Sequence, residues 1–189
     1  GGSPSSGVVV FVKKSIRHIV SFVRSKSTNT LWIRYQTPGR HPSWYFGFVY
    51  CRNALKKHSL EVSEQIQEFR ASGSRVAVFG DFNARLGSFV GDHATNANAP
   101  NLLAFLEFHG LTLLNKSFCY GVPTYVMPEV NKNKTSIIDF GVTDSPDCVK
   151  DFQILDTVFG VTAHSAHRML SYSVSTGTTP SCISPSSSS

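Results

Sequence analysis

Short apolar segments alternate with polar turns along most of the chain, a pattern typical of β-strands joined by loops. In the first fifty residues these segments are rich in β-branched and aromatic side chains, which favour strands. Gly and Pro residues between the segments indicate turns. The strands predicted here are residues 8–12, His18–Val23, Leu31–Tyr35 and Trp44–Cys51.

The hydrophobic period changes in the middle of the chain. Apolar residues recur at i, i+4 and i+7 from Val62, so Leu60–Ala71 is predicted as an amphipathic helix, and Leu102–His109 as a second, shorter one. Many strands with two interspersed helices indicate a layered α/β protein. The later strands predicted are Arg75–Phe79, Leu111–Asn115, Pro123–Val126, Ile137–Val142 and Arg168–Val174.

The composition indicates one domain with polar ends. The chain has 189 residues, of which 41% are hydrophobic, enough for a core. We predict a flexible N-terminus at 1–6, a folded domain at 7–174 and a disordered Ser/Thr/Pro-rich tail at 175–189. No membrane-spanning run and no signal-peptide pattern occur, which predicts an intracellular protein, the nucleus included, with no membrane partner. The four cysteines form no zinc half-site, which favours free thiols.

Charge is distributed unevenly along the chain. Residues 1–60 contain ten Lys and Arg and no acid, whereas the remainder carries eight basic and all twelve acidic residues. A basic segment of this kind favours a polyanionic partner, because neutralised phosphates release counterions. The alternative is a solvated basic face without a partner.

The segment Gly-Asp-Phe-Asn at 80–83 directly follows an apolar strand. Strand alternation places Asp81 and Asn83 on one side. A carboxylate and an amide at a strand end can hold a divalent cation, its water or a phosphate oxygen. The alternative is an ordinary turn, since Gly, Asp and Asn are turn residues.

Two further residues are candidates for chemistry. Asp139 interrupts an apolar strand, and a buried carboxylate is costly unless it is paired. His167 lies just before the last predicted strand. An aspartate paired with a histidine fixes the imidazole tautomer and raises its basicity, which suits a general base. Asp139 is the partner we expect for His167; a lone histidine is otherwise a surface or capping residue.

Taken in order, the Gly-Asp-Phe-Asn-Ala-Arg segment at 80–85, the Ser136-to-Asp139 strand and the Ser-x-His-Arg segment at 165–168 resemble the endonuclease/exonuclease/phosphatase superfamily. The wording is most similar to the endonuclease domains of LINE-type (non-LTR) retrotransposons, over roughly residues 7–174. The resemblance implies a DNase I-like α/β sandwich, with two packed mixed sheets flanked by helices. It also implies an N-terminally truncated domain that lacks the family's first strands and helix.

The resemblance assigns roles to individual residues. It implies Mg²⁺-dependent hydrolysis of DNA, with Asp81 near the metal and the attacking water and Asn83 positioning the phosphate. Asp139 would orient His167 and contribute to the metal site. Tyr50 would contact the scissile phosphate, although a core aromatic is the alternative. DNA is the implied partner, and an ancestral fusion to a reverse transcriptase is left open; the residues predict nothing about oligomeric state.

Two departures from the family pattern bear on activity. Ala166 stands where the family has an aspartate, and the family's upstream metal-binding glutamate has no counterpart in the first sixty residues. The metal site is therefore expected to be incomplete, with Asp81 and Asp139 as its carboxylates and with His164 as a further ligand of little weight. We expect weak or lost activity. The alternatives are a non-catalytic nucleic-acid-binding remnant, a phosphodiesterase acting on a small molecule, and an α/β fragment without function.

Overall fold

The computed structural model describes residues 8–39, 41–51, 55–129, 132–158, 161–162 and 166–176. A six-stranded mixed sheet in the order β1-β2-β3-β4-β8-β5 forms its centre. Only β3 and β4 run parallel, and the other neighbours in this sheet are antiparallel. The strands are β1 (Val20–Val23), β2 (Thr30–Tyr35), β3 (Trp44–Tyr50), β4 (Arg75–Asp81), β5 (Thr112–Leu113) and β8 (Asp139–Thr143).

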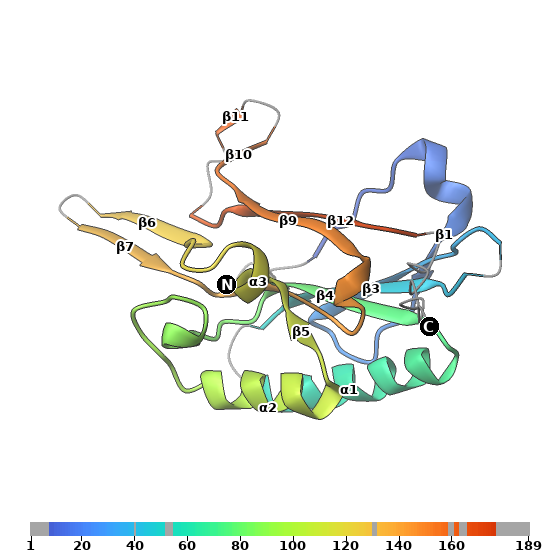
Figure 1. The fold of residues 1–189 in the computed structure, drawn as a ribbon, viewed down its shortest axis with the longest axis horizontal. Helices are drawn as coiled ribbons and strands as arrows, with labels where there is room; N and C mark the ends of the chain where they lie inside the picture. Colours follow the sequence, from blue (N-terminus) through green and yellow to red (C-terminus); the bar gives the residue numbers. More distant parts are fainter. Residues whose placement is uncertain are drawn as a thin grey trace, which may run out of the picture.

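Helices cover one face of this sheet and a second sheet covers the other (Figure 1). The second layer is an antiparallel pair, β9 with β12, and the ribbon of β6 and β7 projects from the same end. These and the remaining elements are α1 (Leu55–Ala71), α2 (Ala99–His109), α3 (Leu114–Phe118), β6 (Tyr125–Glu129), β7 (Lys132–Ser136), β9 (Val149–Leu155), β10 (Thr157–Val158), β11 (Val161–Thr162), β12 (Met169–Val174) and the short 3-10 helices η1 (Lys14–Ile19), η2 (Gly87–Phe89) and η3 (Pro146–Cys148).

Strand alternation divides the core into two clusters. On β4, Val76 and Val78 pack toward α1 and α2, whereas Ala77 and Phe79 pack toward β9 and β12. Phe79 stacks on Tyr172 of β12, with ring centroids 3.7 Å apart. Both faces of β4 are therefore covered, as in the central strand of a layered α/β protein. The predicted fold class is confirmed; the second layer is antiparallel in the part of the chain described.

Several predicted elements need correction. Residues 8–12 form no strand: Val9 and Phe11 are exposed and no described strand pairs with this segment. β-propensity cannot replace a neighbouring strand, which must accept and donate the ladder hydrogen bonds. His18–Val23 is a strand only from Val20, because η1 takes its first residues. The predicted strand Leu111–Asn115 is short, because α3 begins at Leu114.

The helices begin earlier than predicted, α1 at Leu55 and α2 at Ala99. Among the described residues, no helix combines the length and apolarity that crossing a membrane requires. Cys51, Cys119 and Cys148 are free thiols, as the cysteine spacing predicts. His164, Cys182 and the predicted N-terminus at 1–6 lie outside the described residues.

Candidate active site

Three predicted site residues lie side by side at the ends of neighbouring strands. Tyr50 of β3 is in register with Asp81 of β4, and Asp81 is in register with Asp139 of β8. Residues in register across a sheet point to the same face. That face is the one packed by β9 and β12, because Phe79, two residues before Asp81, packs there. The three side chains therefore share one end of one face.

Gly80 allows β4 to lie close to β3 at this point. Its φ is +135°, and a Cβ atom here would lie 2.1 Å from the carbonyl oxygen of Val49, so only glycine fits. On the other side of Asp81, the amide N–H of Cys51 donates to the carbonyl oxygen of Asp81 at 2.7 Å. Burial, with Asp81 nearby, raises the pKa of the Cys51 thiol to about 12, which leaves it unreactive.

Asn83 lies at the turn that leaves β4. Its φ of 50° is left-handed, a conformation that asparagine tolerates. Its amide N–H donates to Asp81 Oδ1 at 2.7 Å, and its carbonyl oxygen accepts hydrogen bonds from the side chains of Asn96 and Asn98, both at 2.9 Å. Asn83 is therefore held next to Asp81 by both the turn and the following loop.

His167 contacts Asp139 across a long sequence separation. Its Nδ1 lies 3.0 Å from Asp139 Oδ2 and 3.2 Å from Oδ1. The edge of the Tyr125 ring meets the imidazole, with centroids 4.9 Å apart, where β6 forms a single bridge to His167. The hydrogen bond to Asp139, aided by the negative charges of both aspartates and opposed by burial, raises the pKa of His167 above its usual value.

Two residues without a predicted role hold Asp139 in place. Thr124, which is fully buried, accepts the amide N–H groups of Ile138 and Asp139 at its Oγ1, both at 3.0 Å. Asn115 of α3 donates to the carbonyl oxygen of Asp139 and accepts the amide N–H of Gly141, both at 3.0 Å. Its side chain thus continues the ladder where β5 ends. Only a buried polar residue beside an apolar run hinted at this in the sequence.

The carboxylate of Asp81 is in an unfavourable environment. Burial, followed by the negative charge of Asp139, raises the pKa of Asp81 to about 6, although the amide N–H of Asn83 and the imidazole of His167 oppose the shift. Asp81 is 8% exposed and Asp139 7%. One ligand atom from each of Asp81, Asp139 and His167 lies within 4.8 Å of the other two. Two carboxylates and an imidazole converging in this way can hold a divalent cation.

The other predicted positions lie at the margin of this cluster. Tyr50 is half-buried, which differs from the fully buried aromatics of the core such as Trp44. Ala166 brings no carboxylate; its carbonyl oxygen accepts the amide N–H of Val126 at 2.8 Å. The structure thus brings Asp81, Asp139 and His167 together, with Asn83 and Tyr50 beside them.

A second buried carboxylate, Asp92, was not predicted as important. Arg85 donates to it through Nε at 3.0 Å and Nη2 at 2.6 Å, and Ile137 donates its amide N–H at 3.0 Å. His93 Nδ1 lies 3.3 Å from its Oδ1. Burial would raise the pKa of Asp92, but the guanidinium of Arg85 and the amide N–H groups outweigh it and lower the pKa. This cluster fixes the loop after Asn83 to the chain that enters β8.

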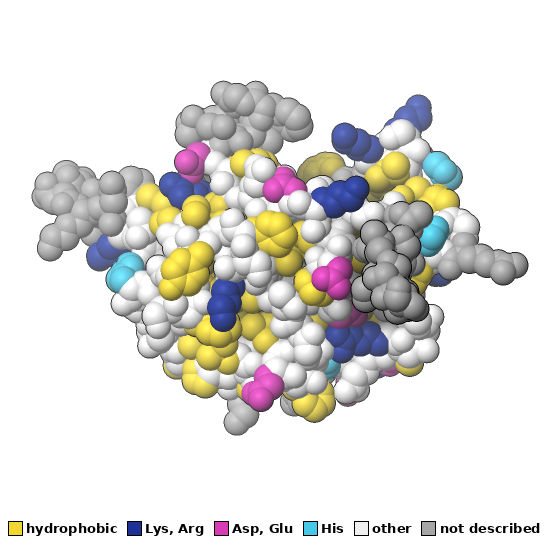
Figure 2. All heavy atoms as spheres, viewed as in Figure 1, with side chains coloured by type: hydrophobic (Ala, Val, Ile, Leu, Met, Phe, Trp, Pro, Cys, Tyr) yellow, Lys and Arg dark blue, Asp and Glu magenta, His cyan; other side chains and the backbone are white. Residues whose placement is uncertain are grey.

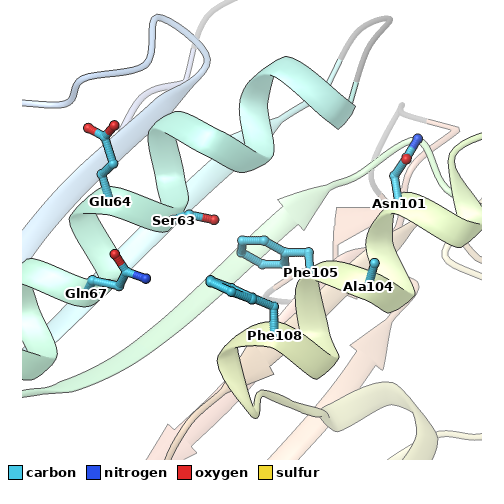
Figure 3. Close-up of a pocket in the computed structure, with 7 residues that line it drawn as sticks. All are labelled: Ser63, Glu64, Gln67, Asn101, Ala104, Phe105 and Phe108. Carbon is cyan, nitrogen blue, oxygen red and sulfur yellow. The ribbon is translucent and has the colours of Figure 1, made fainter.

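A groove of about 490 Å³ lies between α1 and α2, on the opposite face of the sheet (Figure 3). Phe105 and Phe108 of α2 point toward Ser63 and Gln67 of α1. Glu64 is the one titratable residue in its lining. Ser63 also joins the helices by a 2.8 Å hydrogen bond to His109. The groove lacks the converging acidic and basic groups of the Asp81 cluster and is not the candidate active site.

No protein-family model and no curated protein matches this sequence. Solved structures do match the fold. The endonuclease domain of TRAS1, a telomere-specific non-LTR retrotransposon, superposes with a TM-score of 0.66 at 16% identity, covering 83% of this chain and 69% of that one. The AP endonuclease LMAP from Leishmania major gives 0.61 at 11% identity, covering 78% of this chain and 55% of that one.

The 3'-5' exonuclease NExo from Neisseria meningitidis gives a TM-score of 0.58 at 14% identity, covering 82% of this chain and 70% of that one. At these identities the comparisons establish a shared fold. The chain therefore has the fold of the endonuclease/exonuclease/phosphatase proteins, and the resemblance drawn from the sequence is confirmed at that level.

Proposed function

We propose that this chain hydrolyses phosphodiester bonds in DNA with the help of a divalent cation. The observation that carries the proposal is the convergence of Asp81, Asp139 and His167 from two strand ends and a distant segment. The fold, shared with nucleases of a retrotransposon and of Neisseria and Leishmania, supports the same reaction class.

The donor atoms fit a divalent cation. Mg²⁺, which the resemblance implies, uses one or two carboxylates and several waters, and Asp81 and Asp139 supply two. The two like charges raise the pKa of Asp81, so a cation between them would relieve their repulsion. A bound cation would supply charge neutralisation at the phosphate and the leaving oxygen. Ala166 offers no carboxylate, so we expect weak binding and slow hydrolysis.

The protein side chains would share the remaining tasks. The Asp139 carboxylate faces Nδ1 of His167 and leaves Nε2 to exchange a proton with water or the leaving oxygen. Asn83 is held where its side-chain amide would contact a phosphate oxygen. Tyr50, in register with Asp81, would direct its hydroxyl toward the same phosphate.

A specific observation favours a second candidate, DNA binding without catalysis. The described cations Lys13, Lys14 and Arg17 lie on or beside η1, a helix with no buried residue, and Arg24 follows β1. Figure 2 shows Lys and Arg side chains gathered at this corner, at the upper right. Such a surface would bind DNA with strong salt dependence and would need no metal.

Supercoiled plasmid incubated with the full chain and Mg²⁺ separates the two candidates. Hydrolysis predicts slow nicking that Asp81→Ala abolishes, with Asp92-linked His93→Ala as the matched control that nicks normally. Salt-sensitive DNA binding that survives combined Asp81→Ala and His167→Ala, without nicking by the unmodified chain, would instead support the second candidate. Absence of both nicking and magnesium binding would refute hydrolysis.

A further inference from the structure

The three converging side chains differ chemically from a pure oxygen site. Asp81 and Asp139 offer carboxylate oxygens, but His167 offers an imidazole nitrogen within the same 4.8 Å cluster. Mg²⁺ prefers oxygen ligands and keeps its waters, whereas imidazole suits Zn²⁺ and related first-row metals. A set of two oxygens and one nitrogen, with a position left open to water, is the pattern of a catalytic zinc site.

The geometry around His167 allows this use of its ring. Nδ1 lies 3.0 and 3.2 Å from the two oxygens of Asp139 and so faces the carboxylate as a whole. The His167 side chain is 39% exposed, which leaves access from solvent, whereas that of Asp139 is 10% exposed. Thr124 and Asn115 hold the Asp139 backbone from two sides, so one ligand is fixed before any cation arrives.

We propose that Asp81, Asp139 and His167 form a three-ligand site that binds Zn²⁺ more tightly than Mg²⁺. The proposal rests on the same site as the proposed hydrolysis but concerns which cation that site selects. For a site of nitrogen and oxygen donors, affinity rises from Mn²⁺ toward Zn²⁺. Coordination through Nδ1 would place the ring proton on Nε2, so the ligand role and the hydrogen bond to Asp139 exclude each other.

A second aspartate–histidine pair in the molecule provides a matched control. Asp92 and His93 are also adjacent, but Arg85 already places two N–H groups on Asp92 at 3.0 and 2.6 Å. The guanidinium occupies the position that a cation would take. This pair is therefore not expected to bind Zn²⁺.

Calorimetric titration of the full chain with Zn²⁺, and separately with Mg²⁺, tests the proposal. We expect Zn²⁺ to bind more tightly than Mg²⁺, His167→Ala to weaken Zn²⁺ at least about 10-fold, and His93→Ala to change neither affinity. All variants keep the four cysteines, so zinc bound by thiols appears equally in each titration. Co²⁺ gives an independent optical readout: intense visible bands from the unmodified chain, lost in His167→Ala and in Asp81→Asn.

Zinc binding that is lost in both variants supports the proposal even where plasmid stays intact, which would count against hydrolysis alone. Equal Zn²⁺ affinity in the unmodified chain and in His167→Ala overturns it. Magnesium bound as tightly as zinc also overturns it, even where magnesium supports nicking. A circular-dichroism spectrum of each variant confirms that a lost signal does not come from unfolding.

Discussion

Two buried aspartates in this protein, Asp92 and Asp81, have opposite electrostatic surroundings. Arg85 and backbone N–H groups compensate Asp92 fully, and its pKa is lowered despite burial. Asp81 is as deeply buried but faces a second carboxylate, Asp139, and its pKa is raised to about 6. One carboxylate is paired inside the fold, and the other is left with charge that the fold does not neutralise.

This difference separates a structural from a functional acid. A paired carboxylate stabilises a loop and needs nothing further, whereas an uncompensated one costs stability and gains by binding a cation. Both clusters contain a histidine, so residue type does not distinguish them. The presence of Arg85 in one and of Asp139 in the other does.

The largest expected effect is on the compensated side. Asp92→Ala leaves the Arg85 guanidinium and the Ile137 amide N–H without their acceptor, so we expect a loss of about 3–5 kcal/mol in the free energy of unfolding, as for other broken buried ion pairs. Urea denaturation of this variant and of the unmodified chain measures it. A loss no greater than for a surface substitution would show that Asp92 is not a structural acid.

The opposite sign is expected for Asp81→Asn. The folded-state pKa of about 6 lies above the ordinary 3.8, so the contribution of this group to stability is greatest below pH 3.8 and is lost as pH rises through 6. At pH 8 the ionised group costs about 3 kcal/mol. Asp81→Asn should therefore stabilise the chain at pH 8 and much less at pH 4, measured by urea denaturation at both. Equal effects at the two pH values would contradict the account.

Thr124→Val tests how Asp139 is held. The substitution keeps the shape but removes the acceptor for two buried N–H groups, so we expect a loss of about 1–3 kcal/mol in unfolding free energy and weaker Zn²⁺ binding. Thr124→Ser retains the hydroxyl and should restore the zinc affinity more than the stability. Zinc binding unaffected by Thr124→Val would mean that Asp139 keeps its position without Thr124.

The smallest effect is expected for His93→Ala. The side chain of His93 is 68% exposed and Asp92 already has its arginine. We expect a change within about 0.5 kcal/mol in the free energy of unfolding, as for most surface substitutions. A substantially larger loss would show that the imidazole, and not only Arg85, neutralises Asp92.

The sequence predicts what depends on local pattern. The apolar runs around β4 and the helical period of α1 are visible because neighbouring residues determine them. Residues 8–12 show the limit, since five apolar residues resemble a strand yet depend on a partner that no local pattern supplies. Strand register across β3, β4 and β8 likewise follows only from the assembled sheet.

The candidate site divides in the same way. Asp81 and Asn83 stand out in a short motif, and the expected pairing of Asp139 with His167 follows from chemistry and is present in the structure. Thr124, Asn115 and Asp92 could not be singled out, because each acts through backbone groups between 14 and 45 residues away. Their roles in catalysis or metal binding stay predictions.

Paramagnetic broadening by Mn²⁺ tests the central claim, that Asp81, Asp139 and His167 face one cation position, most directly. In nitrogen spectra of the chain labelled at its histidine rings, substoichiometric Mn²⁺ should broaden the His167 signals, assigned with His167→Gln, and spare those of His93. The broadening should disappear in Asp81→Asn. His167 signals that stay sharp while Mn²⁺ broadens other histidines would contradict the claim.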